Sequence, residues 1–253
     1  MAFTDLVPVP PGINAGLSSA RQATMLSLLG NPRAWYDQEC RDIASPALAA
    51  LVVARPVGHL KVRGLAPAVE SLARVLDDVR QAEPALYRAI GHAGMLCVRN
   101  VRGSTTAISN HSWGTAIDVT IDGVLDRRGD DRVLDGLARL APHFNRHGWY
   151  WGAGFPTEDG MHFECGEALI RHWHAEGRFG APSRTVPDLL TLGDRGAEVV
   201  VVQWKLNAAG AELAVDGEFG RGTHAAVMAF QAAHGLDVDG VVGPRTRAAL
   251  GLA

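Results

Sequence analysis

Two short segments, far apart in the chain, carry the side chains best suited to chemistry. Residues 109–118 contain His111 and Asp118, and residues 158–164 contain His162. Two imidazoles and one carboxylate are a donor set that binds zinc in hydrolytic enzymes, where three protein ligands leave the fourth tetrahedral position to water. These residue types therefore indicate a zinc centre of the hydrolytic kind.

A second carboxylate lies beside this donor set. Asp159 precedes His162 by three positions, so it is well placed to accept a proton from a water molecule at the metal. Zinc lowers the pKa of its bound water to about 7 and also polarises a carbonyl group. Together these residues predict hydrolysis of an amide bond.

Local structure must bring His111 and Asp118 to one point. They are seven positions apart, and an odd separation on a continuous strand would place them on opposite faces of a sheet. Gly114 lies between them, and glycine adopts the backbone conformations that a turn requires. We therefore expect His111 before a turn, Asp118 within a strand over 116–121, and His162 on a neighbouring strand.

Helices and short strands follow one another without regular alternation up to about residue 175. Helix start and stop residues and the spacing of apolar side chains predict helices over 20–29, 66–81, 84–91, 134–144 and 167–175. Short apolar and β-branched runs predict strands over 95–98, 116–121 and 161–165. This order predicts the α+β class, with a small antiparallel sheet and flanking helices that carry the zinc site.

The composition changes after residue 176. Residues 177–187 are rich in glycine and proline, which is typical of a linker. Beyond them, the pattern Asp-Gly-x-x-Gly-x-x-Thr occurs at 216–223 and again at 239–246. Each copy is a glycine-containing turn that leads into a helix, and a helix over 198–209 precedes them. These features predict a small three-helix domain, which is near the lower size limit for an independent core.

The chain is accordingly divided into four parts. We expect an N-terminal extension that packs on the catalytic domain (1–54), the zinc-binding catalytic domain (55–178), a linker (179–189) and the three-helix domain (190–253).

Composition excludes several classes of function. The 253 residues are 47% hydrophobic and 20% charged, with a formal net charge of −3, which is ordinary for a soluble globular protein and gives no electrostatic reason to expect nucleic acid as a partner. The longest apolar stretch, 46–54, is too short for a membrane span of about 20 residues. No basic segment followed by an apolar one begins the chain, so we expect synthesis in the cytoplasm and release by another route.

The three cysteines leave two interpretations open. Cys40, Cys97 and Cys165 lack the spacing of a metal-binding pair. Buried free thiols are the ordinary outcome for such residues. A disulfide between Cys40 and Cys97 is the alternative, and the sequence does not choose between them.

The pattern around the donor set resembles a known family. Ser109, His111, Gly114, Ala116 and Asp118 fill every position of S-x-H-x-x-G-x-A-x-D, and an acid three residues before a second histidine follows. This pattern is similar to that of the zinc peptidases of bacterial cell walls, the D-alanyl-D-alanine carboxypeptidase or VanY-like group. The resemblance covers roughly residues 58–175. It implies that His111, Asp118 and His162 bind one Zn²⁺.

The second half of the motif bears on the scissile bond. The resemblance makes Asp159 the general base, although Glu158 adjoins it. The form Asp-x-x-His-Phe-Glu at 159–164 is typical of the L-alanyl-D-glutamate endopeptidase branch, which includes phage endolysins. Carboxypeptidase members commonly have Glu-x-x-His instead. We therefore expect an L-Ala–D-Glu endopeptidase, with a D-Ala–D-Ala carboxypeptidase or a cross-bridge endopeptidase as alternatives.

Further site residues follow from the same resemblance. The family has an arginine upstream of its first histidine that stabilises the oxyanion or binds a substrate carboxylate. Arg99 and Arg102 are the candidates, and Arg99 is favoured because it ends a predicted strand. Ser109, Arg102 and Trp151 are expected to contact substrate.

The C-terminal repeat, with the helix between its copies, resembles the three-helix peptidoglycan-binding domain found beside wall hydrolases. The resemblance covers about residues 190–252 and implies that this domain raises the local concentration of the catalytic domain at the cell wall. We expect bacterial peptidoglycan as the partner, a monomer, and release by a holin-like or other unconventional route. The rival hypothesis is a wall-binding protein that has lost its activity.

Overall fold

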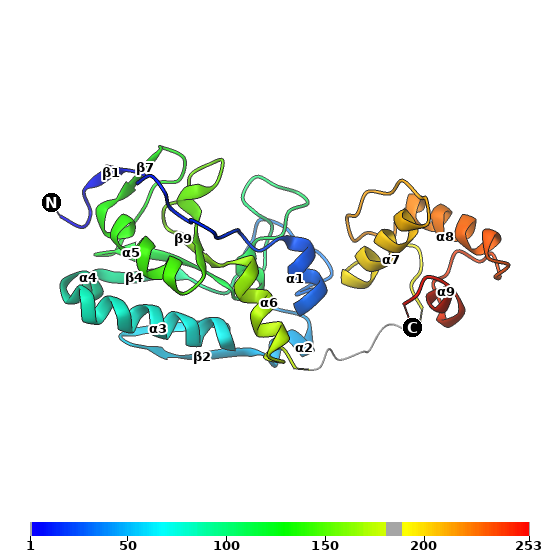
Figure 1. Cartoon of the computed structure of the whole chain (residues 1–253), viewed down its shortest axis with the longest axis horizontal. Helices are drawn as coiled ribbons and strands as arrows, with labels where there is room; N and C mark the ends of the chain where they lie inside the picture. The colour runs from blue at the N-terminus through cyan, green and yellow to red at the C-terminus, as the bar shows by residue number, and fades with distance from the viewer. Residues whose placement is uncertain (1, 181–188, 253) are drawn as a thin grey trace.

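A computed structural model describes residues 2–180 and 189–252, in which the buried apolar side chains form two separate clusters. The larger cluster is formed by residues before 181 together with Val200, and the smaller one by residues 190–252. Figure 1 shows the two corresponding units of the chain. Most of the predicted linker, 181–188, lies outside the described residues. The division of the chain into four parts, drawn from the sequence, remains a prediction.

The centre of the larger unit is a five-stranded antiparallel sheet whose strands differ in length. Its strands follow the order β4-β5-β9-β8, and β6 pairs with β5 beside this path. The strands are β4 (Ile90–Gly94), β5 (Ala116–Ile121), β6 (Val124–Leu125), β8 (Trp149–Trp151) and β9 (His162–Cys165). The small antiparallel sheet with flanking helices confirms the predicted α+β class.

Amphipathic helices bury their apolar sides against this sheet. Helix α3 (Ala66–Ala82) buries Val69, Leu72 and Val79 at helical spacing, as a core-facing stripe requires. The remaining helices of this region are α4 (Pro84–Ala89) and α5 (Asp135–Arg146). The predicted helices over 66–81, 84–91 and 134–144 are therefore present with small shifts at their ends.

Strand prediction failed in one region. The apolar run 95–98 forms no strand and contributes only an isolated bridge between Arg41 and Val98. The neighbouring Gly-containing segment forms β4 instead, with an irregularity between His92 and Gly94 where it pairs with β5. An unpredicted hairpin also precedes α3, formed by β2 (Val52–Val57) and β3 (Leu60–Leu65). Pairing with a distant strand, rather than local apolar content, determined these outcomes.

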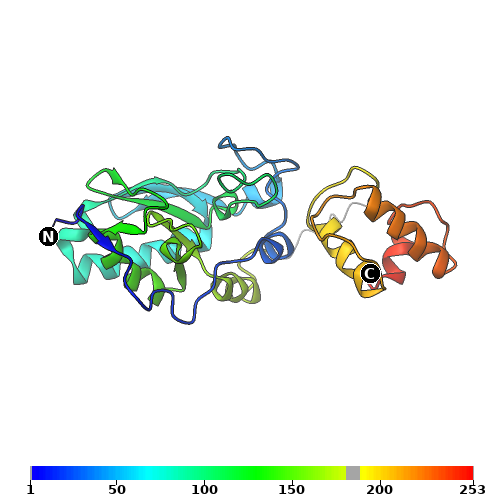
Figure 2. The same cartoon turned by 90° about the horizontal axis from the view of Figure 1, so that it is seen from above.

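The first 50 residues pack along the larger unit (Figures 1 and 2). Strand β1 (Leu6–Pro8) pairs with β7 (Arg132–Leu134), and α1 (Gln22–Leu29) buries Met25 and Leu26 in the main cluster. Helix α2 (Pro46–Ala49) follows, and α6 (Glu167–Ala175) lies against α1, where Thr24 donates a hydrogen bond to Glu167.

The cysteines resolve the choice that the sequence left open. Cys40 and Cys97 form a disulfide, and Cys165 is a buried free thiol. The disulfide joins the N-terminal segment to the residues that precede Arg99. Beside it, the backbones of Arg41 and Val98 exchange two hydrogen bonds of 3.1 and 2.9 Å.

The smaller unit contains α7 (Ala197–Ala208), α8 (Arg221–Ala233) and α9 (Pro244–Ala249). Its two sequence repeats share one hydrogen-bond pattern. Gln203 Nε2 donates to Asp216 and Thr223, and Gln231 Nε2 donates to Asp239 and Thr246, at 2.8 and 3.1 Å in both copies. In each copy, the repeated Asp and Thr therefore accept hydrogen bonds from the amide of a buried glutamine. These bonds give the polar amide partners inside a small apolar core.

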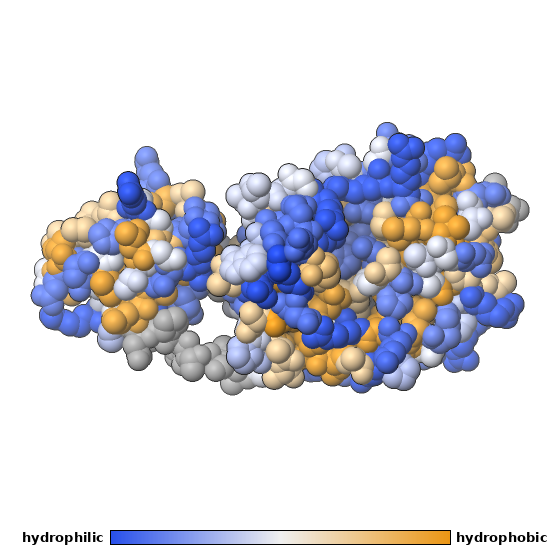
Figure 3. All heavy atoms as spheres, turned by 180° about the vertical axis from the view of Figure 1, so that it is seen from behind, coloured by the Kyte–Doolittle hydropathy of each residue, from blue (hydrophilic) through white to orange (hydrophobic). Residues whose placement is uncertain are grey.

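The surface exposes both hydrophilic and hydrophobic residues, as the composition of the chain leads one to expect. On the face shown in Figure 3, hydrophilic residues surround scattered hydrophobic patches. In the described ranges, 2–180 and 189–252, no helix has the length and apolar composition of a membrane span.

Candidate metal centre

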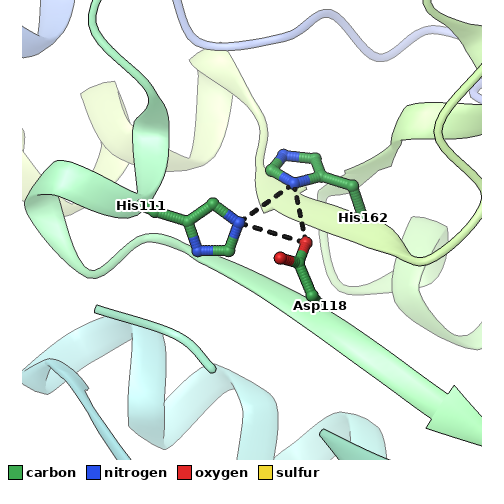
Figure 4. Close-up of side chains that lie close together, drawn as sticks. All are labelled: His111, Asp118 and His162. Atoms are coloured by element: carbon green, nitrogen blue, oxygen red, sulfur yellow. Dashed lines mark hydrogen bonds and ion pairs between the residues drawn. The ribbon is translucent and has the colours of Figure 1, made fainter. Parts of the chain in front are cut away.

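Three secondary-structure elements bring the predicted metal ligands together (Figure 4). His111 lies in a short 3-10 helix (Asn110–Trp113) that ends at Gly114, whose φ of 66° reverses the chain into β5. Asp118 lies on β5, directly opposite His162 in the pairing with β9. The turn therefore removes the problem of their odd spacing, because His111 is not on the strand.

The three side chains point at one another. His111 Nε2 lies 3.1 Å from Asp118 Oδ1 and 3.2 Å from His162 Nδ1, and the third side of this triangle, from His162 Nδ1 to Asp118 Oδ1, is 3.2 Å. Ligand atoms about 2.0–2.2 Å from a tetrahedral zinc lie about 3.3–3.5 Å apart. The separations and the two-histidine, one-carboxylate donor set both fit Zn²⁺. It is the single group of this kind within the described residues.

The outer nitrogen of each imidazole has its own partner. His111 Nδ1 donates to the Met95 carbonyl oxygen at 3.0 Å, and His162 Nε2 donates to Glu164 Oε2 at 2.9 Å. Asn110 also donates to Glu164 Oε2. These bonds assign the tautomers that leave His111 Nε2 and His162 Nδ1 free to bind a metal, and such partners orient ligand histidines in zinc sites. Glu164 therefore orients His162.

The charged groups of the triangle shift one another's pKa. Burial lowers the pKa of His162, but hydrogen bonds to Asp118 and Glu164 outweigh burial and raise it to about 10. Burial opposes ionisation of Asp118, but the two histidines hold its pKa well below its usual range. A divalent cation at this point replaces the proton on His162, so metal affinity falls as pH falls.

Asp159 lies at the same cleft and Glu158 does not. Asp159 Oδ1 is buried and has no hydrogen-bond partner in the described part of the chain, and burial raises the pKa of this carboxyl. The Glu158 carboxylate instead accepts the backbone N–H groups of Gly129 and Gly160, at 3.1 and 2.6 Å. Of these two neighbouring acids, Asp159 is therefore the one with a free acceptor at the cleft.

Arginines line the cleft from two sides. The cavity has a volume of about 750 Å³, and Arg99, Arg102 and Arg128 line it together with the triangle and Asp159. Burial and the neighbouring Arg102 lower the pKa of Arg99, while Asp118 and Asp159 favour its charge. The cleft is thus positively charged around an acidic centre, a field suited to an anionic ligand or a developing oxyanion.

Arg128 was missed in the sequence analysis. It follows β6 and its Nε lies 3.5 Å from Asp159 Oδ2. Nothing in the local sequence distinguishes it from Arg127 next to it. Only the pairing of β6 with β5 brings this loop to the cleft.

Two expectations about substrate contacts have different outcomes. Ser109 lines the cleft beside Arg102, although the partner of His111 is the Met95 carbonyl and not Ser109. Trp151 has 0% of its surface exposed and donates its indole N–H to the Gly160 carbonyl oxygen. The expectation that Trp151 contacts substrate is therefore wrong. The side chain packs in the core because it lies on the inner face of β8, stacked on Phe163.

Comparison with known proteins agrees with both sequence resemblances. Residues 102–165 match the family model described as D-alanyl-D-alanine carboxypeptidase, and residues 195–250 match the model described as putative peptidoglycan binding domain. A zinc D-Ala-D-Ala carboxypeptidase of Streptomyces albus G is 44% identical over 61 residues, which are 22% of this chain and 24% of that protein. The chain thus matches about a quarter of the length of this curated relative.

Two solved structures are also similar over a quarter of the chain. A Burkholderia AP3 phage endolysin is 53% identical over 25% of each chain, with a TM-score of 0.25. A peptidoglycan-binding protein from Clostridioides difficile is 38% identical over 25% of this chain and 40% of its own, also with a TM-score of 0.25.

The structure thus contains a larger unit with a candidate zinc site, joined to a small helical unit. Residues 102–165, which include the whole triangle, are similar to a D-alanyl-D-alanine carboxypeptidase family model, and residues 195–250 are similar to a peptidoglycan-binding domain model. The resemblances stated from the sequence are confirmed for these two segments.

Proposed function

We propose that this protein hydrolyses an amide bond in the stem peptide of bacterial peptidoglycan, with one zinc ion bound by His111, Asp118 and His162. The observation that carries the proposal is the triangle of three ligand atoms, 3.1–3.2 Å apart, with the unpartnered Asp159 oxygen in the same cleft. When bound there, zinc supplies a water of lowered pKa and polarises the scissile carbonyl.

The chain's own residues supply the remaining steps. Asp159 Oδ1 accepts the proton of the attacking water and passes it to the leaving amine, because its buried surroundings raise its pKa and no donor among the described residues occupies this oxygen. Arg99 and Arg128 lie at the cleft as positive groups for the negative charge that develops on the carbonyl oxygen. Met95 and Glu164 hold the two imidazoles in place.

For the scissile bond we propose L-Ala–D-Glu, on the Asp-x-x-His-Phe-Glu form of the motif. A D-Ala–D-Ala carboxypeptidase is the second candidate, supported by the description of the family that residues 102–165 match. Residues 190–253 hold the enzyme on the wall, so that the polymer is both substrate and anchor. We propose action at the bacterial cell wall by a monomer.

Digestion of purified peptidoglycan followed by mass spectrometry tests the reaction and the bond together. Cleavage of L-Ala–D-Glu releases peptides that begin with D-Glu, whereas carboxypeptidase action releases free D-alanine. Activity should disappear with a chelator and return with Zn²⁺. A protein that binds walls and releases neither product, with zinc present, would be the non-catalytic wall-binding protein instead.

A further inference from the structure

A second hollow adjoins the catalytic cleft and has no part in the proposed reaction. It has a volume of about 590 Å³, and Gln22, Ala107 and Ile108 line both hollows. We call it the side cavity. Because these three residues line both hollows, the two hollows are adjacent.

The side cavity is built from parts of the chain that the peptidase motif does not include. Asn31, Trp35 and Tyr36 contribute one wall, from the segment that follows α1, and Thr105 and Thr106 contribute the next. Residues 195–196 and 215–218, which belong to the segment matching a peptidoglycan-binding domain, line the opposite wall. The two units therefore meet around this cavity.

Its lining is aromatic and polar at the same time. Trp35 keeps 45% of its surface exposed. The guanidinium carbons of Arg33 and Arg41 lie 4.8 and 4.7 Å from the centroid of its ring and fix the position of the indole. The Tyr36 hydroxyl hydrogen-bonds to Asn31 Oδ1, which orients the amide so that Nδ2 faces Gly196 on the other wall. A held aromatic ring offers contact area at low entropic cost, and a few placed polar groups orient a ligand.

The acidic side chains on the wall formed by residues 195–196 and 215–218 already have partners within the protein. Glu218 pairs with Arg195 at 2.9 Å, and Asp216 accepts a hydrogen bond from Gln203 at 2.8 Å. What the cavity offers is therefore mainly hydroxyl, amide and indole groups. Such a lining suits an uncharged ligand rich in hydroxyl and acetamido groups better than an anionic polymer, which would meet the two acids.

We propose that the side cavity binds the glycan strand of peptidoglycan while the catalytic cleft holds the stem peptide attached to it. This inference rests on the proposed function and deepens it, because it makes a glycopeptide the substrate. An extended peptide advances about 3.3–3.6 Å per residue, so a strand held next to the cleft favours cleavage close to the sugar. The L-Ala–D-Glu bond lies one residue from the sugar, whereas D-Ala–D-Ala ends the stem.

The test compares two soluble substrates that differ only in the sugar. The zinc-loaded full-length protein is assayed on a free stem peptide and on the same peptide attached to its disaccharide. Binding energy from a remote part of the substrate raises kcat/KM, so we expect about a tenfold preference for the glycopeptide. Trp35→Ala should bring the ratio of the two kcat/KM values towards one. Trp204→Ala is the matched control, since Trp204 is 46% exposed and lines neither hollow.

A second measurement keeps the inference separate from the proposed reaction. Binding of a peptide-free glycan oligomer is followed by calorimetry with wild type and with both tryptophan variants. Weaker binding by Trp35→Ala alone supports the cavity as a glycan site even if no peptide is cleaved. Equal kcat/KM on both substrates, or equal glycan binding by all three proteins, overturns the inference and leaves the peptidase proposal intact.

Discussion

Glu158 and Asp159 are adjacent in the sequence, but their carboxylates differ in their hydrogen-bond partners. The Glu158 carboxylate accepts backbone N–H groups of the neighbouring loops, among them those of Gly129 and Gly160. Asp159 faces the cleft with an oxygen that no described residue approaches as a donor. A general base needs a free acceptor within reach of the proton, so the geometry separates two acids that the motif alone left ambiguous.

We expect Asp159→Asn to lower kcat on stem peptide by about 10²–10⁴-fold, the usual contribution of a general acid–base group. Zinc binding should survive, since the triangle is unchanged, and isothermal titration with Zn²⁺ checks this. Glu158→Gln is the matched control. It loses one acceptor for a loop N–H, which costs about 1–3 kcal/mol of stability, and should retain most of the activity. Similar losses of kcat in both variants would contradict the assignment of Asp159 as the general base.

Asp126 shows the cost of a buried acid without a full set of partners. Its exposed fraction is 4%, and its Oδ2 has no hydrogen-bond partner among the described residues. A methyl group added at Gly160 would collide with this atom and lie 3.0 Å from Glu158 Oε1, so the two carboxyls are close neighbours. Burial and the charge of Glu158 raise the pKa of Asp126 to about 6.

This raised pKa predicts a pH-dependent stability. Folding favours protonated Asp126, so the stability that it contributes is complete below its ordinary pKa of 3.8 and is lost as pH rises through about 6. Asp126→Asn stays neutral, and should be more stable than wild type by about 1–3 kcal/mol above pH 7, with no difference near pH 4. Denaturant unfolding at both pH values measures this. Exposed Asp122→Asn is the control, and a gain for Asp126→Asn that is the same at pH 4 and pH 8 would contradict the titration.

At the scale of elements, one glycine turn sets the position of His111. Gly114 has a φ of 66°, and a Cβ there would lie 2.8 Å from both Gly64 Cα and Leu65 N on β3. The turn therefore needs glycine for two reasons, a left-handed backbone and a close approach of two backbones. The hairpin that the sequence did not reveal is thus a support of the metal centre.

We expect Gly114→Ala to destabilise the protein by more than about 2 kcal/mol, because strain and a backbone clash add together. Zinc affinity should fall as well, since the turn carries His111. Gly103→Ala isolates the strain, because Gly103 has a φ of 81° but no atom within 4 Å of an added Cβ. Its cost should be about 1 kcal/mol, measured by denaturant unfolding, with zinc affinity unchanged. If the two variants were equally stable, the close contact between Gly114 and β3 would make no contribution to stability, and the prediction would be wrong.

At the scale of the whole molecule, the chain forms two units whose cores are largely separate. Most of the smaller core is its own, but Val200 on α7 packs into the larger cluster, and α7 contacts α1. The proposed roles divide accordingly, with hydrolysis in the larger unit and attachment in the smaller. Attachment acts on effective concentration, so it matters at an insoluble polymer and not for a small peptide.

Removal of residues 190–253 should therefore lower the rate of wall lysis by about 10²-fold or more, the gain that linked binding provides. The kcat/KM on a soluble stem peptide should stay within about threefold of wild type, because no catalytic group is removed. Circular dichroism checks that the shortened chain folds. Full-length Asp159→Asn is the opposite control, since it should sediment with walls without lysing them. Equal losses on walls and on soluble peptide would mean that the smaller unit supports folding rather than attachment.

The sequence by itself determined the features that are local or repeated. His111, Asp118, Asp159 and His162 lie in two short motifs whose spacing survives into the site, and the helices over 66–82 and 167–175 follow from apolar spacing within each segment. The two copies of the glycine turn likewise revealed the helical unit. Such signals need no knowledge of which distant segments meet.

Only the tertiary structure decided what depends on distant partners. Segment 90–94 became a strand in place of 95–98 because it pairs with β5, and Trp151 turned into the core because β8 pairs with β9. Arg128 reaches the cleft through the pairing of β6 with β5, and the side cavity is lined by segments that lie far apart in the sequence. A strand gains its hydrogen bonds and a side chain its burial from residues far along the chain, so neither can be decided within a local window.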